Sequence, residues 1–251
     1  MKNLRYNPFS LEGKTILVTG ASSGIGRQTA IECSKMGALV IITGRNEERL
    51  KETFQQMNGT GHQSIKAELT EASSVQNLVS MVERIDGLVL CAGVGNTNPF
   101  LFSSREKYDK VFDVNFFAPV ELLRLLVKKK RINSGGSVVF VSSISGTYSF
   151  LIGNSIYGAS KAAFNSTMKF CAKELAPKKI RVNSVNPGMV NTQLITSGII
   201  SEEQHKVDME KYPLKRYGEP EEIAWGIIYL LSEASAWTTG HSLVIDGGVT
   251  I

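Results

Sequence analysis

The chain has 251 residues, of which 42% are hydrophobic, so it can bury the core of a single α/β domain spanning residues 1–251. It has no apolar run long enough to cross a membrane and no apolar leader, so we expect a cytoplasmic protein with no membrane contact. Three isolated cysteines indicate neither a disulfide framework nor a metal site, and the net charge of +5 leaves an acidic partner open.

The first predicted strand, residues 15–19, leads directly into a glycine-rich turn. The strand is short, apolar and β-branched, and Gly20, Gly24 and Gly26 follow it in a Gly-x-x-x-Gly-x-Gly pattern before a helix that ends near Gly37. Such glycines let the backbone approach a pyrophosphate, and the helix start offers free N–H groups. A glycine turn alone would be weak evidence, but the strand and the helix on either side of it predict dinucleotide binding.

Strand-like and helix-length segments alternate along the rest of the chain. This alternation predicts right-handed crossovers and a single-domain, Rossmann-type, doubly wound parallel sheet of seven strands with helices on both faces. Long helices are predicted at residues 104–130 and 155–175, and the segment of about 192–213 is the least regular. The predicted strands are residues 15–19, 39–43, 64–67, 87–91, 137–141, 181–185 and 242–245.

Tyr157 and Lys161 are four residues apart on the helix predicted at 155–175, so both side chains lie on one face of it. A fixed cation beside a phenol favours the phenolate and lowers its pKa, which suits proton transfer. Taken alone the pair is a weak signal, because an aromatic residue beside a solvated lysine on a helix surface is the commoner arrangement.

Together these motifs resemble the short-chain dehydrogenase/reductase family, and the pattern is most similar to that of its 3-oxoacyl-acyl-carrier-protein reductases. The resemblance runs along nearly the whole chain. It is carried by residues 19–26, Asn115, Ser142-Ser143, Tyr157 to Lys161, the Pro-Gly segment at 186–192 and the last strand and loop at 239–248.

The resemblance implies an oxidoreductase that moves a hydride between a nicotinamide cofactor and a carbonyl or alcohol. Tyr157 would exchange the proton, Ser143 would hydrogen-bond the same oxygen, Lys161 would lower the tyrosine pKa and hold the ribose, and Asn115 would support a water chain. The residues expected to bind the cofactor are Gly20, Ser22, Ser23, Gly24, Ile25, Gly26, Arg45, Glu68, Leu69, Ala92, Gly93, Tyr157, Lys161, Pro187, Gly188, Val190 and Thr192.

The end of the second strand bears on the choice between NADP and NAD. Gly44 stands where a unit built for NAD has an acidic residue, and Arg45 follows it, as in relatives that prefer NADP. A guanidinium can pair with the 2′-phosphate, so NADP is favoured. In the alternative interpretation, Arg45 begins a solvated loop and pairs with a glutamate.

Three features depart from the family pattern. Glu68 replaces the usual aspartate that contacts adenine, Cys91 stands where a bracing asparagine is usual, and Ser143 lies fourteen positions before Tyr157, one more than is common. The longer side chain of Glu68 is expected to shift the contact with adenine. The absence of the asparagine at Cys91 bears on the rigidity of the strand ends and not on the chemistry.

The substrate and partners stay open at this stage. An acyl substrate on an acidic carrier protein is one possibility, since Lys129 and Lys173 fall where the reductases carry basic residues. The alternatives are a sugar, polyol or steroid alcohol dehydrogenase, a non-catalytic dinucleotide sensor, and a basic nucleic-acid binder. We expect no nucleic acid, because residues 128–131 end a helix, where cations complement the dipole, and no aromatic residues are interleaved with them.

Two further expectations come from the resemblance. The segment at about 192–213 would be the flap over the substrate. Apolar positions on the two long helices, such as Phe116, Phe117, Phe164 and Met168, need a second cover, and with the last strand they predict a homotetramer, or a dimer if only the helix interface forms.

Overall fold

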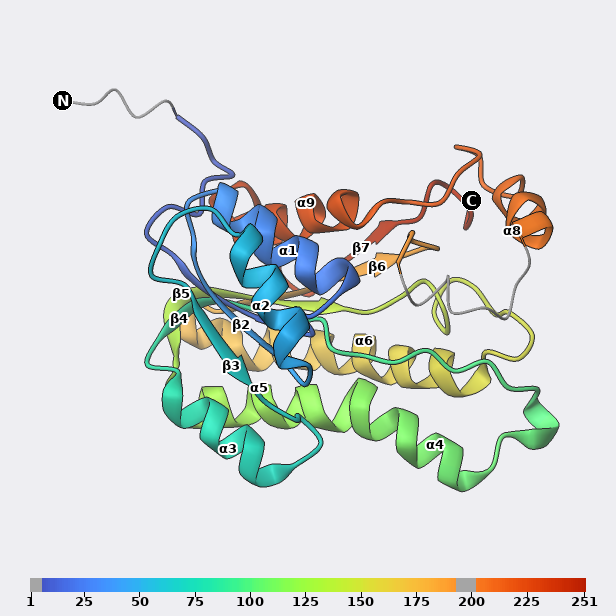
Figure 1. Cartoon of the computed structure of the whole chain (residues 1–251), viewed down its shortest axis with the longest axis horizontal. Coiled ribbons are helices and arrows are strands. Elements are labelled where there is room, and N and C mark those ends of the chain that lie inside the picture. Colours follow the sequence, from blue (N-terminus) through green and yellow to red (C-terminus); the bar gives the residue numbers. More distant parts are fainter. Residues whose placement is uncertain (1–5, 193–201) are drawn as a thin grey trace.

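Seven parallel strands form one sheet in the order β3-β2-β1-β4-β5-β6-β7 in the computed structural model, which describes residues 6–192 and 202–251 (Figure 1). Because neighbouring strands pair in parallel, their carboxyl ends lie along the same edge, as the pairing of Thr19 with Thr43 illustrates. The predicted seven-stranded parallel sheet is therefore confirmed. The strands are β1 (Thr15–Thr19), β2 (Leu39–Gly44), β3 (Gln63–Lys66), β4 (Ile85–Leu90), β5 (Ile132–Val141), β6 (Arg181–Pro187) and β7 (Ser242–Ile245).

Helices cover both faces of the sheet. In Figure 1, α1 (Gly24–Lys35), α2 (Glu47–Gln56) and α9 (Pro220–Leu231) lie on one side of it. On the other side lie α3 (Ala72–Met81), α4 (Arg105–Phe112), α5 (Ala118–Lys128) and α6 (Ser155–Leu175). The strand order reverses direction between β1 and β4, and ligands of open α/β sheets bind beyond the strand ends at such a point.

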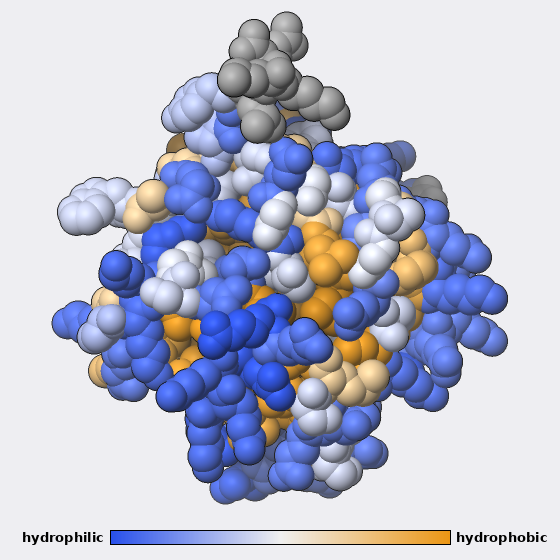
Figure 2. Space-filling model, turned by 90° about the vertical axis from the view of Figure 1, so that its left-hand side faces the viewer, coloured by the Kyte–Doolittle hydropathy of each residue, from blue (hydrophilic) through white to orange (hydrophobic). Residues whose placement is uncertain are grey.

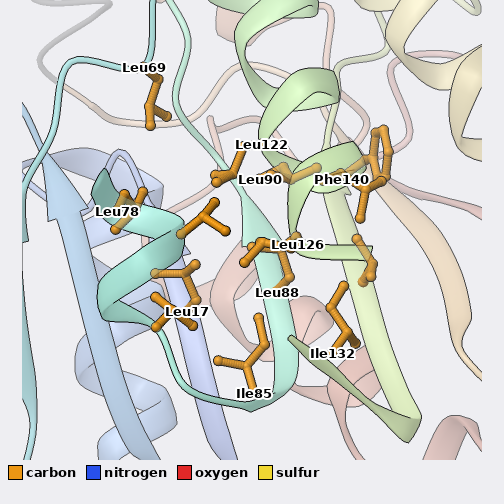
Figure 3. Close-up of a cluster of buried hydrophobic side chains, with 14 of the residues drawn as sticks. Leu17, Leu69, Leu78, Ile85, Leu88, Leu90, Leu122, Leu126, Ile132 and Phe140 are labelled. Carbon is orange, nitrogen blue, oxygen red and sulfur yellow. The ribbon is translucent and has the colours of Figure 1, made fainter. Parts of the chain in front are cut away.

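Each layer has its own apolar core because strand side chains alternate between the two faces. Leu17 packs with the α3, α5 and α6 side, whereas its neighbours Ile16 and Val18 pack with α1 and α9. Figure 3 shows the first of these clusters, where leucines of β4 and α5 meet the ring of Phe140. Because both faces are covered, β1 and β2 are nearly continuous apolar runs rather than alternating ones.

The helix predicted as one element at 104–130 is interrupted. A π-helical segment, Asp113–Phe117, separates α4 from α5 and contains Asn115. The Asn115 side chain is fully buried and forms hydrogen bonds with both the N–H and the carbonyl of Val94. A π-bulge rotates the helix locally, and such bulges occur frequently at functional sites.

Two expectations about apolar residues need correction. Phe164 and Met168 are buried within the chain rather than left for a partner, because α6 turns them onto the sheet, where the Phe164 ring lies 4.4 Å from that of Phe140. Phe117, in contrast, is exposed.

The segment predicted as irregular contains a helix, α8 (Glu202–Met209), and residues 193–201 of the predicted flap lie outside the described residues. No helix in the described ranges, 6–192 and 202–251, is long and apolar enough to cross a membrane.

The basic residues Lys128, Lys129 and Lys130 are exposed where α5 ends, and Lys130 has the left-handed φ of 54° that is common at helix ends. On the side of the molecule toward which α5 runs, hydrophilic residues cover most of the surface and hydrophobic ones show between them (Figure 2). The lysines therefore stand at a solvated helix terminus.

The packing of Phe164 on Phe140 should contribute strongly to stability. Phe164 is 1% exposed, so Phe164→Ala removes a whole ring from the core and should lower the free energy of unfolding by about 3–5 kcal/mol. Phe100→Ala, at a position 77% exposed, is the matched control and should change it by about 0.5 kcal/mol or less. Urea denaturation of both variants measures the difference, and equal effects would contradict this account of the core.

Candidate active site

The glycine turn after β1 lies directly against the chain that leaves β4. Gly20 has a φ of +67°, and a Cβ atom there would lie 2.8 Å from the Ala92 Cα. Gly24, with a φ of +52°, faces Thr192, whose Cγ2 would lie 3.2 Å from a Cβ at Gly24. Only glycine combines this backbone conformation with this approach. The fold thus brings four of the predicted cofactor residues together.

The hydroxyl of Thr19 links the ends of β1 and β4. It accepts hydrogen bonds from the N–H groups of Cys91 (3.0 Å) and Ala92 (3.2 Å) and lies 3.2 Å from the Val89 carbonyl, to which it donates. This threonine braces the strand ends, and it satisfies the N–H groups of Cys91 and Ala92 at the place where the family pattern has an asparagine. Sequence reasoning did not assign Thr19 this role, and its only signal was a hydroxyl at the end of a buried strand.

Tyr157, Lys161 and Ser143 meet where α6 crosses the end of β5. The Lys161 ammonium is buried, donates to the Val141 carbonyl at 2.9 Å and lies 5.8 Å from the centre of the Tyr157 ring. Tyr157 is half-buried and hydrogen-bonds the Ser143 side chain. The Ser143 hydroxyl also accepts from the Ser145 N–H at 3.0 Å.

The loop after Ser143 is held against the first turn of α6. Gly146 has a φ of +80°, and a Cβ at Gly158 would lie 3.2 Å from the Ser145 Oγ and 3.3 Å from the Gly146 nitrogen. The Asn154 side-chain amide donates to the same Ser145 oxygen at 2.8 Å. These close approaches place Ser143 beside Tyr157 despite the longer spacing between them in the sequence.

Asn115 connects the loop after β4 to α6. Its Oδ1 accepts from the Val94 N–H at 2.8 Å, and its Nδ2 donates to the Val94 carbonyl at 3.0 Å and to the Ser160 hydroxyl at 3.1 Å. A Cβ at Gly93 would lie 3.3 Å from the Asn115 Oδ1 and 3.5 Å from the Lys161 Nζ. Asn115 thereby fixes the loop that lies next to the lysine.

Burial shifts the pKa of both candidate proton-transfer groups against their charged forms. It raises the pKa of the Tyr157 phenol, while the hydrogen bond with Ser143 acts in the opposite direction. It lowers the pKa of Lys161 to about 8. The expected lowering of the tyrosine pKa by Lys161 is therefore not found in the protein alone, because the ammonium is directed at the Val141 carbonyl rather than at the phenol oxygen.

Arg45 and Glu68 lie together at the ends of β2 and β3. The Arg45 Nη1 is 3.6 Å from the Glu68 Oε2. Arg45 thus does pair with a glutamate, although the partner lies after β3 and not in the loop of residues 45–49. The Leu69 side chain is buried in the core, so only its backbone can face a ligand.

The remaining predicted cofactor residues occupy two places. At the helix start, Ser23 precedes α1 without capping it, the Ser22 carbonyl accepts from Arg27, and Ile25 packs partly buried on the core below Gly26. At the end of β6, Pro187 accepts from Ile144, Gly188 donates to Ile245, and Val190 is buried.

The chain resembles known proteins over nearly its whole length. Residues 20–250 match a protein family described as enoyl-(acyl carrier protein) reductase. The 3-oxoacyl-acyl-carrier-protein reductase FabG of Rickettsia bellii is 36% identical and covers 95% of this chain and 98% of its own. L-xylulose reductase of Mesocricetus auratus is 32% identical, and the match covers 96% of this chain and 98% of that protein. A crystal structure of a dehydrogenase/reductase from Sinorhizobium meliloti 1021 is 32% identical, has a TM-score of 0.88 and covers 97% and 98%.

The fold, the glycine turn and these matches together define the class of protein: the chain belongs to the short-chain dehydrogenase/reductase family. It is an oxidoreductase that transfers a hydride between a nicotinamide cofactor and a carbonyl or alcohol group.

The described residues fit such a cofactor. The turn at Gly20 and Gly24 leaves no side chain where the pyrophosphate of a dinucleotide approaches the α1 N-terminus, and Thr192 stands across from it. At the other end, the backbone at Gly93 lies close to the Lys161 ammonium, which a Cβ there would meet at 3.5 Å. Both places lie at the carboxyl ends of the strands, where dinucleotides bind in open α/β sheets.

The lowered pKa of Lys161 predicts a pH-dependent contribution to stability. Between pH 8 and the ordinary lysine value of 10.5, the unfolded chain holds a proton that the folded protein has released, so stability rises with pH in this window. We compare the free energies of unfolding of the unaltered protein and of Lys161→Met at each pH. The difference between them should shift by up to about 3 kcal/mol in favour of the unaltered protein from pH 7 to 10. Urea denaturation of both proteins at several pH values measures this, and a difference that is constant with pH would refute the shift.

Proposed function

We propose that this protein is an NADPH-preferring reductase of 3-oxoacyl thioesters, with the acyl chain carried on an acidic carrier protein. The observation that carries the choice of substrate is a set of exposed apolar residues on the loops after β4 and β5. In Figure 1 these loops extend to the right, beyond the strand ends. Their exposed apolar residues are Phe100, Leu101, Phe102, Phe150, Leu151 and Ile152.

The two loops support each other beside the candidate site. The Asn98 N–H donates to the Gly153 carbonyl at 2.7 Å, and a Cβ at Gly153 would lie 3.4 Å from the Thr97 Cγ2. One loop begins next to Gly93 and the other next to Ser143, so apolar side chains flank the approach to Tyr157. Apolar surface of this kind suits an acyl chain better than a sugar, whose hydroxyls need polar partners.

The proposed chemistry divides the work among four side chains. When bound, the nicotinamide supplies the hydride that reaches the carbonyl carbon. Tyr157 donates its proton to the carbonyl oxygen as negative charge develops there, and Ser143 donates a hydrogen bond to that oxygen. Lys161 holds the ribose and stabilises the phenolate, and Asn115 orders the water through which the proton is replaced.

Arg45 supports the preference for NADPH. It follows Gly44 at the end of β2, and its guanidinium is exposed and can take a 2′-phosphate as a bidentate partner. Lys129 and Lys173 are exposed and support an acidic carrier as the partner.

Reduction of a small sugar is the second candidate, favoured by the similarity to L-xylulose reductase. The discriminating experiment follows NADPH oxidation with acetoacetyl thioesters, longer 3-oxoacyl thioesters, ketoses and quinones. The proposal predicts that kcat/KM rises with acyl chain length and is lower for ketoses. The opposite ranking would favour the sugar reductase.

A cytoplasmic homotetramer is part of the same proposal. Phe117 and Phe170 on the outer sides of the helical layer, and Trp237 and Ile251 near the last strand, are large apolar residues left exposed, which supports two separate interfaces. Light scattering should give four times the monomer mass of 27.4 kDa at micromolar concentration. A monomer would overturn this part of the proposal.

Removal of the Tyr157 hydroxyl tests the assigned proton donor. Tyr157→Phe should leave the fold and NADPH binding intact and reduce turnover by roughly a hundredfold or more, since Tyr157 is the proposed proton donor. Tyr148→Phe, an exposed tyrosine on the neighbouring loop, is the matched control and should keep near-normal turnover. Steady-state kinetics and NADPH titration measure turnover and cofactor binding in both variants. Near-normal turnover in the Tyr157 variant would contradict the assignment of Tyr157 as the proton donor.

A further inference from the structure

The ion pair between Arg45 and Glu68 occupies the place where the adenosine end of the cofactor is expected. The Arg45 side chain is 65% exposed and that of Glu68 is 31% exposed, and their closest charged atoms are 3.6 Å apart. The pair lies beside the glycine turn, because the Ala67 N–H donates to the Gly44 carbonyl and a Cβ at Gly44 would lie 3.5 Å from the Ser22 Oγ.

Glu68 is the more firmly held member of the pair. Its Oε1 accepts hydrogen bonds from the Thr70 hydroxyl at 2.8 Å and the Thr70 N–H at 3.2 Å. Its backbone N–H donates to the Ser74 hydroxyl at 2.9 Å. Oε1 is thereby taken up within its own loop, and Oε2 is left facing the guanidinium. Among residues 6–192 and 202–251 Arg45 has no such anchor, so it is the member that can turn toward a ligand.

Two neighbouring cations already have partners. The Arg27 guanidinium is 2.8 Å from Glu52 and donates to the Ser22 carbonyl, and Lys66 is 3.6 Å from Glu47. Arg45 directly follows Gly44, which places it at the end of β2. A phosphate brought to it comes within a few ångströms of the Glu68 carboxylate, and two like charges at that separation repel.

We propose that Glu68 is a specificity-determining residue, whose carboxylate competes with the ribose 2′-phosphate for Arg45 and so limits the preference for NADPH over NADH. The proposal rests on the proposed binding of the 2′-phosphate by Arg45. NADH carries a neutral hydroxyl at this position, so the charge of Glu68 acts on one cofactor and not on the other. A contact between Glu68 and adenine would instead affect both cofactors equally.

The experiment replaces the charge of Glu68 and keeps its shape. Glu68→Gln retains an oxygen that can accept from Thr70, and the probes are 2′,5′-ADP and 5′-AMP, which differ only in the 2′-phosphate. Calorimetry on the full chain should show that 2′,5′-ADP binds about three- to tenfold more tightly to Glu68→Gln than to the unaltered protein. The affinity for 5′-AMP should change by less than about twofold. The gain should shrink at high salt. A misfolded variant cannot produce a gain in affinity for one probe alone.

Glu47→Gln is the matched control, because Glu47 pairs with Lys66 at the same 3.6 Å separation on a neighbouring part of the surface. It should change the affinity for either probe by less than about twofold. An effect equal to that of Glu68→Gln would mean that general surface charge is responsible and would overturn the proposal.

Two other results would also overturn it. Weaker binding of 2′,5′-ADP to Glu68→Gln would mean that Glu68 positions Arg45 for the phosphate. An equal change in affinity for 2′,5′-ADP and 5′-AMP would mean that Glu68 contacts adenine.

Arg45→Ala separates this inference from the proposed function. This substitution should weaken the binding of 2′,5′-ADP by about ten- to a hundredfold and leave the affinity for 5′-AMP nearly unchanged. If it does so while Glu68→Gln has no effect, only the competition fails. If Arg45→Ala changes nothing, the 2′-phosphate lies elsewhere, and the proposed role of Arg45 falls together with this inference, whereas the reductase activity is still tested by the substrate panel.

Discussion

The candidate site depends on how α6 crosses the carboxyl end of β5. Three contacts fix this crossing: the Lys161 ammonium donates to the Val141 carbonyl, the Ser142 hydroxyl donates to the Lys161 carbonyl, and the ring of Phe164 packs on that of Phe140. Because the lysine is anchored by both its side chain and its backbone, the helix cannot slide or rotate without leaving a buried ammonium unsatisfied, which is costly. The position of Tyr157, one turn earlier, follows from this anchoring.

The same burial that fixes the site also sets its electrostatics. In the protein alone, the charged forms of Tyr157 and Lys161 are both disfavoured, with the lysine pKa lowered to about 8. The group poised beside the phenol is the Ser143 hydroxyl, and the ammonium stands further off, 5.8 Å from the ring centre. Stabilisation of the phenolate by Lys161 therefore requires the ammonium to come closer to the phenol, and its three N–H donors allow one of them to stay on the Val141 carbonyl.

Sequence predicted the sheet and the positions of the glycine turn and of Tyr157, because buried parallel strands and glycine conformations leave strong local patterns. It failed where the outcome depends on contacts between distant segments. The π-helical segment at Asn115 is fixed by Val94, and the bracing by Thr19 depends on the chain after β4. The burial of Phe164 follows from which face α6 turns to the sheet, and the partner of Arg45 lies more than twenty residues away.

A crystal structure of the protein with NADPH tests the central claim most directly, namely that Tyr157, Lys161 and Ser143 form one site at the sheet edge with the glycine turn. The account predicts the pyrophosphate at the α1 N-terminus, the nicotinamide ribose within hydrogen-bond distance of the Lys161 Nζ, and the nicotinamide ring facing the Tyr157 hydroxyl. A dinucleotide bound with its nicotinamide away from Tyr157, or with the Lys161 Nζ still on the Val141 carbonyl and not on the ribose, would contradict it.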